Sequence, residues 1–208
     1  MTSGTNQSII NQIQIDYSNN PLAIFLIGAN GSGKSTLRKY LDLSEIQTNI
    51  DPDALNRIFK PQNPEHYQVL AARNALDMYK RALDKKLNLC IESTLCGHGT
   101  LSRIREAKEH GYHLIGYFIG LNSAKLNIAR IANRVRNGGH YIDDETVKRR
   151  YNESINNLLK TYQLFDKLYI IDNSQPLYSL QLSKSFNKKE IYAQRLEQWV
   201  EEVNSLLT

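Results

Sequence analysis

The sequence predicts an α/β fold with a five-stranded, mainly parallel sheet that carries helices on both faces. Apolar runs of strand length alternate with longer segments of helical spacing along the chain. Alternating strands and helices favour a parallel sheet, because each connection crosses back over the sheet. Polar residues follow most of the apolar runs, and open parallel sheets bind ligands beyond the carboxyl ends of their strands. We therefore expect the functional site at that end of the sheet.

Each expected strand is an apolar run bounded by polar or turn-forming residues, as in buried strands. The runs span residues 22–27, 46–50, 87–91, 112–121 and 168–171, with a short further strand expected at 178–182. The expected helices have apolar residues at spacings of three and four. They span residues 35–40, 64–86, 101–110, 123–136, 144–162 and 188–207. Gly111 is a helix stop signal, and a Gly-Gly pair at 138–139 follows another helix.

The composition is that of one globular domain. The chain has 208 residues, of which 41% are hydrophobic and 23% are charged, which suits a single hydrophobic core. We expect one domain over residues 21–208, preceded by a polar extension over residues 1–20. Isoleucines between residues 9 and 15 of this extension could form a short docked helix.

Several classes of protein are disfavoured by the sequence. No apolar run approaches the roughly twenty residues that cross a bilayer, and no secretory signal is evident, so we expect a cytoplasmic protein without membrane contact. Cys90 and Cys96 lack zinc-type spacing and are expected to be reduced packing residues. The net charge of +5 permits a nucleic-acid partner, but the basic residues concentrate between 125 and 150. This distribution favours compact phosphates over nucleic acid.

The most specific motif follows the first expected strand directly. It reads Gly28-Ala29-Asn30-Gly31-Ser32-Gly33-Lys34-Ser35-Thr36, the G-x-x-x-x-G-K-[ST] pattern of a phosphate-binding loop. In this loop backbone N–H groups surround the β-phosphate, Lys34 reaches the β- and γ-phosphates, and the Ser35 hydroxyl ligates Mg²⁺. The positive end of the following helix adds to the attraction. The motif predicts binding of a nucleoside triphosphate such as ATP, and the P-loop NTPase or kinase fold.

Three carboxylates follow the second and third expected strands. Asp53 is our candidate for the base of a phosphoryl transfer, because an acceptor hydroxyl would approach the phosphate loop from that side. Asp51 could hold the acceptor or a metal-bound water, and either aspartate could instead cap a helix. Glu92 could position Mg²⁺ or bind substrate hydroxyls, or it could be an ordinary strand-end residue. Ser93 and Thr94 could contact substrate or merely cap the turn.

A basic segment over residues 123–162 is expected to form a mobile helical lid that carries arginines. Arg134 and Arg136 end one helix, and Arg149 and Arg150 lie on the next. Guanidinium groups bind phosphate oxygens through paired hydrogen bonds and stay charged. Helical phase does not choose between Arg134 and Arg136, and it favours Arg150 over Arg149 modestly. A solvated basic face is the alternative interpretation.

These residues resemble the zeta toxin group of P-loop kinases, and in particular its stand-alone bacterial branch. The resemblance extends from the first strand to about residue 182. Besides the phosphate loop it rests on Asp51-Pro52-Asp53, Ile91-Glu92-Ser93-Thr94-Leu95, Arg134-Val135, Gly138-Gly139-His140, Arg149-Arg150-Tyr151 with Ser154, Asn157 and Leu158, and Tyr169 with Asp172-Asn173-Ser174.

The resemblance implies ATP- and Mg²⁺-dependent phosphorylation of a hydroxyl on a nucleotide sugar, typically UDP-N-acetylglucosamine. It makes Lys34, Asp53, Arg134 and Arg150 (or Arg149) the catalytic groups, and it places Asn173 near the nucleotide base. The side chains expected to bind the small-molecule acceptor are Asp51, Asp53, Glu92, Ser93, Thr94, Arg136, His140 and Arg149. Mg²⁺ would lie on Ser35, with Asp51 or Glu92 as a further ligand.

Two further features of the group bear on this chain. Members that are paired with an antitoxin are inhibited by a small helical protein, so such a partner is possible here. The Asn that usually precedes Pro-Asp is Asp51 in this chain. The extra carboxylate changes the local charge, so the acceptor could differ from the usual one.

Two alternative functions stay open. A polynucleotide, RNA or dinucleotide kinase would use the same donor site, although the chain lacks basic and aromatic residues interleaved along a groove. A nucleotide-dependent ATPase switch would bind ATP and transfer nothing. Such a switch normally has a clear Walker B strand and an arginine from a neighbouring subunit, and neither is evident in the sequence.

Overall fold

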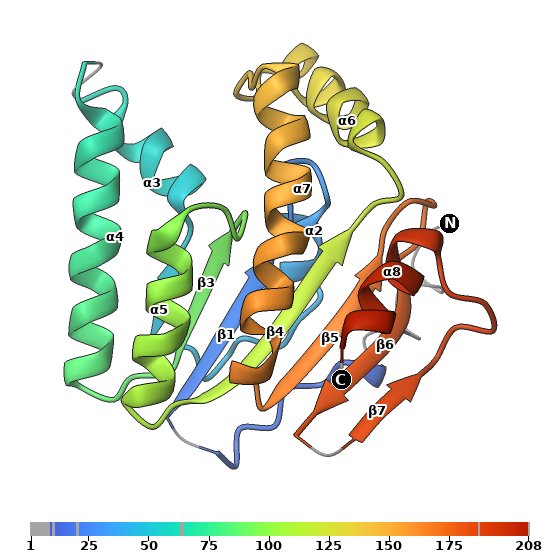
Figure 1. Cartoon of the computed structure of the whole chain (residues 1–208). Coiled ribbons are helices and arrows are strands. Elements are labelled where there is room, and N and C mark those ends of the chain that lie inside the picture. Colours follow the sequence, from blue (N-terminus) through green and yellow to red (C-terminus); the bar gives the residue numbers. More distant parts are fainter. Residues whose placement is uncertain (1–8, 10, 20, 63–64, 187, 208) are drawn as a thin grey trace.

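A twisted sheet with helices on both faces forms the centre of the computed structural model (Figure 1). The structure describes residues 9, 11–19, 21–62, 65–186 and 188–207. Within this part of the chain seven strands lie in the order β2-β3-β1-β4-β5-β6-β7. They are β1 (Leu22–Ile27), β2 (Thr48–Ile50), β3 (Leu89–Ser93), β4 (His113–Gly120), β5 (Lys167–Asp172), β6 (Ser179–Ser185) and β7 (Lys188–Ile191).

The helices described are α2 (Lys34–Arg38), α3 (Pro52–Phe59), α4 (Tyr67–Asp84), α5 (His98–Glu109), α6 (Ala124–Arg136), α7 (Asp144–Thr161) and α8 (Gln198–Leu206), with a short 3-10 helix, η1 (Tyr162–Leu164), after α7. Helices α4, α5, α7 and α8 cover one face of the sheet, and α2 lies behind it (Figure 1). None of the helices in the described ranges is both long and apolar enough to cross a membrane.

The predicted α/β fold is confirmed, with a larger sheet than expected. Strands β1 to β5 pair in parallel, and β6 and β7 add two antiparallel strands at one edge. Strand β1 is central, and its alternate residues belong to different cores: Phe25 lies in the core beneath α4, α5, α7 and α8, and Ile24 lies in the core on the side of α2. Full burial of β1 on both faces explains why its sequence is continuously apolar rather than alternating.

The helix predicted over residues 188–207 is wrong in its first half. Residues Lys188–Ile191 form β7, which pairs with β6 between Leu182 and Ser185, and the helix α8 begins only at Gln198. The backbone hydrogen bonds that β6 offers along its free edge outweigh the weak helical spacing of this segment.

Part of the N-terminal extension packs against the sheet. Ile9 lies in a helical turn, and the Ile13 backbone N–H donates to the Ile9 carbonyl at 3.1 Å. Ile13 is fully buried, and its carbonyl accepts a hydrogen bond from the hydroxyl of Tyr117 on β4 at 2.9 Å. The remainder of the expected docked helix, including Ile10, lies partly outside the described residues. The division into an extension and one domain stays a prediction.

Asp166 joins three elements at the amino-terminal edge of the sheet. Its Oδ1 accepts from Lys108 Nζ at 2.6 Å, and its Oδ2 accepts from the Leu114 backbone N–H at 2.8 Å. Burial acts to raise the pKa of Asp166, but these two hydrogen bonds outweigh it and lower the pKa below its usual 3.8. The carboxylate therefore stabilises the fold while it is ionised.

We expect Asp166→Asn to lower the free energy of unfolding at pH 7 by about 1 kcal/mol, because a charge-assisted hydrogen bond to a half-exposed lysine is lost. A carboxyl with a lowered pKa stabilises the fold above its unfolded pKa, and this contribution fades as the pH falls through the folded pKa. Urea unfolding at pH 7, 5 and 3 should therefore show the difference from wild type shrinking below about pH 4. Exposed Asp77→Asn is the control, and a difference that persists unchanged in acid would contradict the assignment.

Candidate active site

The phosphate-binding loop joins β1 to α2 and packs tightly against the ends of β4 and β5. Gly28 has φ +140°, and a Cβ there would lie 2.1 Å from the carbonyl oxygen of Ile119 on β4. Gly33 has φ +107°, and a Cβ there would lie 2.3 Å from Asn173 Nδ2. The conformation and the close contacts both require glycine. The ends of β4 and β5 therefore define the shape of the loop.

Lys34 is buried inside the loop. Its Nζ donates to the carbonyl oxygens of Gly28 at 2.8 Å and Ala29 at 3.1 Å. Burial lowers the pKa of Lys34, although the nearby carboxylates of Glu92 and Asp53 oppose this effect. These hydrogen bonds go to neutral carbonyl oxygens. The ammonium group can therefore transfer them to the charged oxygens of a phosphate bound at the loop, because charged acceptors form stronger hydrogen bonds.

Ser35 and Glu92 form a pair that could hold a divalent cation. Ser35 Oγ donates to Glu92 Oε1 at 2.7 Å, and Glu92 Oε2 is buried without a hydrogen-bond partner among the described residues. Burial raises the pKa of Glu92, against the opposing effects of Lys34 and of the Ser35 hydroxyl. Hydroxyl and carboxylate oxygens are ligands that Mg²⁺ prefers. In the described ranges no group of three or more Cys, His, Asp and Glu side chains could hold a metal, so phosphates and water would have to complete the coordination.

The two aspartates after β2 differ in their surroundings. Asp51 Oδ1 caps α3 by accepting from the backbone N–H groups of Asp53 at 2.9 Å and Ala54 at 3.1 Å. Its other oxygen lies 4.0 Å from Arg38 Nη1. Asp53 lies in the first turn of α3 and is exposed to the cavities described next. Asp51 is thus the helix cap, and neither of these cavities is lined by it.

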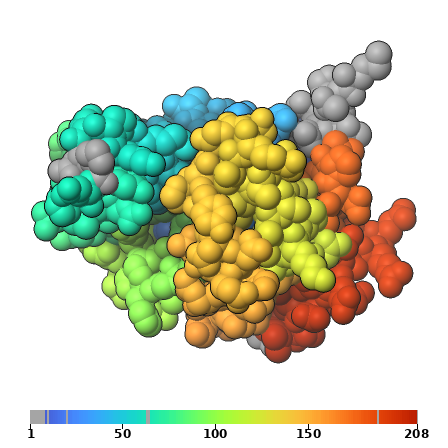
Figure 2. Space-filling model, turned by 90° about the horizontal axis from the view of Figure 1, so that it is seen from above, coloured from blue at the N-terminus to red at the C-terminus, as the bar shows by residue number. Residues whose placement is uncertain are grey.

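Two cavities meet at Asp53. One of about 620 Å³ contains the phosphate loop together with Glu92, Arg134 and Asn173. The other, of about 590 Å³, lies between α4 and the segment that links α6 to α7. Asn30 and Asp53 line both cavities. Viewed from above, the molecule is hollowed between the α3–α4 side and the α6–α7 side (Figure 2).

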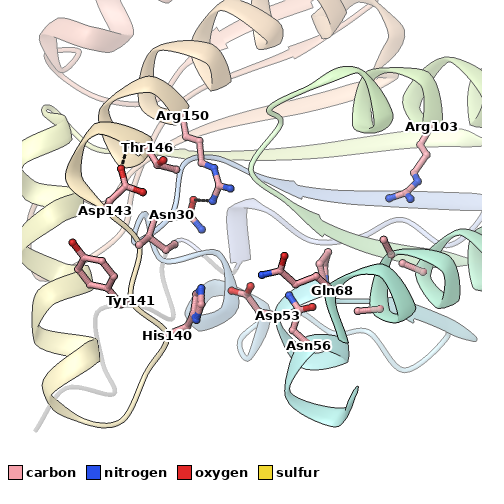
Figure 3. Close-up of a pocket in the computed structure, with 15 residues that line it drawn as sticks. Asn30, Asp53, Asn56, Gln68, Arg103, His140, Tyr141, Asp143, Thr146 and Arg150 are labelled. Carbon is pink, nitrogen blue, oxygen red and sulfur yellow. Dashed lines mark hydrogen bonds between the residues drawn. The ribbon is translucent and has the colours of Figure 1, made fainter. Parts of the chain in front are cut away.

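The second cavity is lined by polar side chains from both sides. Figure 3 shows Asp53 near its middle, with Asn56 and Gln68 beside it and His140 opposite, and with Arg103 at a distance on α5. Its floor on α4 is formed by the small side chains of Ala71, Ala72 and Ala75. Such a cavity could take a polar molecule rich in hydroxyl groups beside the phosphate loop.

The expected lid arginines separate into two sets. Arg150 Nη1 donates to Asn30 Oδ1 at 2.8 Å, and Arg134 lines the cavity of the phosphate loop. Arg149 instead pairs with Glu153 at 3.0 Å on the exposed side of α7. Arg136 is exposed and lines neither cavity. The geometry thus favours Arg134 and Arg150, where helical phase left the first choice open.

Other expected site residues are part of the supporting structure. Ser93 Oγ lies 2.8 Å from Thr100 Oγ1 and accepts from the Leu95 backbone N–H at 3.1 Å, so it caps the turn after β3. Thr94 lines neither of the two cavities. Asn173 does line the phosphate-loop cavity, and its Nδ2 donates to the Ser32 carbonyl at 2.7 Å.

Sequence reasoning missed several lining residues, which are Tyr40, Asn56, Gln68, Arg103, Arg130, Tyr141, Pro176, Leu177 and Tyr178. Two of them carried a signal. Arg130 is one helical turn before Arg134, and Asn56 is one turn after Asp53, so each shares a face with a predicted residue. Tyr178 and Arg103 come from distant elements, and no spacing relates them to the motifs.

We expect Gly33→Ala to weaken ATP binding more than tenfold, because Asn173 and the phosphate loop would have to move apart. Isothermal titration calorimetry with ATP measures the loss. The control is Gly111→Ala, which has φ +77° but open space around its Cβ. Gly111→Ala should lose about 1 kcal/mol of stability from backbone strain and keep its affinity for ATP. Equal affinities of the two variants would contradict the role of the close contact.

Known structures have the same fold. The chain is similar to a structure from the PezAT chromosomal toxin–antitoxin system of Streptococcus pneumoniae, with a TM-score of 0.61 and 16% identity, over 97% of this chain and 91% of that one. It is also similar to AvrRxo1-ORF1:-ORF2 solved with ATP, with a TM-score of 0.63 and 10% identity, over 97% of this chain and 66% of that one. At these identities the likeness concerns the fold alone.

Comparison of the sequence with known proteins identifies the family of this chain. An uncharacterized protein of Haemophilus influenzae is 40% identical over 129 residues, which are 62% of this chain and 91% of the relative. The family model described as zeta toxin matches residues 7–183, which include the phosphate loop, Asp53, Glu92 and the lid arginines. The chain therefore belongs to the zeta toxin family.

Proposed function

We propose that the protein is an ATP- and Mg²⁺-dependent kinase that phosphorylates a hydroxyl of a nucleotide sugar such as UDP-N-acetylglucosamine. Membership of the zeta toxin family indicates phosphotransferase activity in general. The observation that carries the finer proposal is the junction of the two cavities at Asp53 and Asn30. A donor on the phosphate loop and an acceptor in the second cavity would meet beside one carboxylate.

The donor site would be formed by the loop and by the Ser35–Glu92 pair. Lys34 Nζ now donates hydrogen bonds to the carbonyls of Gly28 and Ala29 within the loop. It would donate to phosphate oxygens instead when ATP is bound there. Ser35 and Glu92 would hold Mg²⁺, and the unpartnered Glu92 Oε2 fits this role. Bound Mg²⁺ neutralises charge on the phosphates.

Asp53 would orient and deprotonate the acceptor hydroxyl. It is exposed to both cavities, and its backbone is held by the Asp51 cap at the start of α3. The acceptor oxygen loses its proton to the carboxylate as the bond to phosphorus forms. Positioning is the main contribution of such a base.

The lid arginines would stabilise charge on the transferred phosphoryl group. Arg134 reaches the donor cavity from α6, and Arg150 reaches Asn30 at the junction from α7. Arginine from two different helices can surround the equatorial phosphate oxygens as charge builds there. Arg136 and Arg149 have no part in this proposal, because neither residue lines either cavity.

The acceptor class is supported by the lining of the second cavity. Asn56, Gln68 and His140 offer hydrogen-bond donors and acceptors that suit sugar hydroxyls, and Arg103 offers a positive charge that suits a phosphate of the acceptor. The alanine floor of α4 leaves room for a flat ring. A toxin role with a small helical antitoxin as partner is part of the proposal, and the likeness to a structure from the PezAT toxin–antitoxin system supports it.

Incubation with ATP, Mg²⁺ and UDP-N-acetylglucosamine should give a product about 80 mass units heavier, the mass of one phosphoryl group. Mass spectrometry of a panel with free sugars, dinucleotides and 5′-hydroxyl oligonucleotides distinguishes the nucleotide-sugar kinase from its alternatives. Transfer to another panel member would revise the acceptor. ATP hydrolysis without phosphorylation of any acceptor in the panel would argue for a nucleotide-dependent ATPase switch.

Asp53→Asn should keep its affinity for ATP and lose transfer by at least about a hundredfold, because the base is removed while the donor site is intact. Asp77→Asn, an exposed aspartate on α4, is the matched control. Transfer rates and calorimetric ATP affinity are measured on both variants. Near-normal transfer in Asp53→Asn would show that this aspartate is not the base.

Arg150→Ala should lower kcat by about a thousandfold if its guanidinium stabilises the transition state. The neighbouring Arg149→Ala removes an equal charge from the same helix, yet it should change kcat by no more than about twofold, because Arg149 pairs with Glu153 on the outer side. Steady-state kinetics with ATP and the acceptor that the panel identifies compare the two variants. Equal losses would indicate a general effect of lid charge.

A further inference from the structure

Trp199 contacts the end of the central sheet from the last helix described. The side chain, on α8, is only 5% exposed, and its Nε1 donates to Asp172 Oδ1 at 2.8 Å. Its ring also occupies the space beside Gly120, where a Cβ would lie 2.4 Å from the ring. The indole therefore packs on the end of β4 and donates to the end of β5.

The Asp172 carboxylate shapes the turn that follows β5. Asp172 is buried, and besides the indole it accepts from Ser174 Oγ at 2.7 Å and from the Ser174 backbone N–H at 2.8 Å. Ser174 Oγ in turn accepts from the Asn122 backbone N–H at 2.9 Å. These bonds close the turn tightly around the residue between them, Asn173.

Asn173 connects this turn to the phosphate loop and the lid. Its backbone N–H donates to the Gly120 carbonyl at 3.0 Å, and its Nδ2 donates to the Ser32 carbonyl at 2.7 Å. Its own carbonyl accepts from Arg130 Nη2 on α6 at 2.6 Å. One asparagine thus links β4, the loop and the first lid helix, and its position depends on the turn that Asp172 shapes.

We propose that Trp199 is a positioning residue of the nucleotide site, which acts through Asp172 and Asn173 on the phosphate loop. Without the indole N–H, a buried carboxylate oxygen has one donor fewer and reorients toward the donors that remain. The turn then relaxes, and the bond from Asn173 to the Ser32 carbonyl weakens. Trp199 lies beyond the residues that match the family model, which end at 183, so this chain's C-terminal helix supports its ATP site.

The inference rests on the proposed ATP site, and direct binding tests it without any acceptor. Trp199→Phe removes the N–H donor together with the part of the ring that packs on Gly120, so melting temperatures are measured beside affinities. It should raise the dissociation constant for ATP, measured by calorimetry with Mg²⁺, about fivefold. Asp172→Asn removes the acceptor charge at nearly constant volume and should raise the constant by a similar factor.

A double-mutant cycle tests the route through Asn173. Asn173→Ala should raise the dissociation constant about tenfold, and adding Trp199→Phe to it should cause little further loss, since both act through one bond. Tyr112→Phe is the matched control. It also removes a buried hydrogen-bond donor, to Ala82 and Leu87, but from the opposite end of β4. It should lower the melting temperature and leave ATP affinity unchanged.

The outcomes separate this inference from the proposed function. A wild-type protein that fails to bind ATP would overturn the proposed function, and this inference with it. A wild-type protein that binds ATP, with Trp199→Phe and Asp172→Asn binding equally well despite lower melting temperatures, would overturn this inference alone. Independent, additive losses in the double mutant would overturn the route through Asn173.

Discussion

The burial of Lys34 within the phosphate loop is the constraint on which the rest of the site depends. A buried cation must be surrounded by oxygen atoms, and here the carbonyls of Gly28 and Ala29 supply them. The loop can curl this tightly only because Gly28 and Gly33 accept the close approach of Ile119 and Asn173. Those neighbours come from the end of β4, which pairs with β1, and from the end of β5, the next strand in the sheet. The parallel sheet is therefore part of the loop's architecture.

Charges of opposite sign approach the loop from different elements. The carboxylates of Asp53 and Glu92 come from α3 and β3, and the guanidinium groups of Arg134 and Arg150 come from α6 and α7. This separation leaves space for phosphates between them. The lid arginines approach from above the sheet, since α6 and the start of α7 lie beyond the tips of the strands (Figure 1).

Much of the fold followed from local patterns. Five parallel strands and the phosphate loop were predicted near their observed positions, because buried strands and glycine-rich turns have strong local signatures. The segment 188–207 was predicted wrongly, since its strand β7 forms by pairing with the edge of β6, which periodicity does not report. The two roles of Asp51 and Asp53 were both anticipated, and geometry assigned the cap to Asp51.

Residue type and spacing along the chain were enough to indicate the phosphate loop, a helix start within Asp51-Pro52-Asp53 and a basic lid, because each depends on neighbours within a few positions. The choice of Arg134 over Arg136 needed the packed structure, since helical phase did not separate them and only Arg134 lines the phosphate-loop cavity. The spacing of residues along the chain also gave no indication of Arg103, Tyr178 or Trp199. Their contacts depend on which strands lie side by side in the sheet, and that order is set by packing of the whole chain rather than by any local segment.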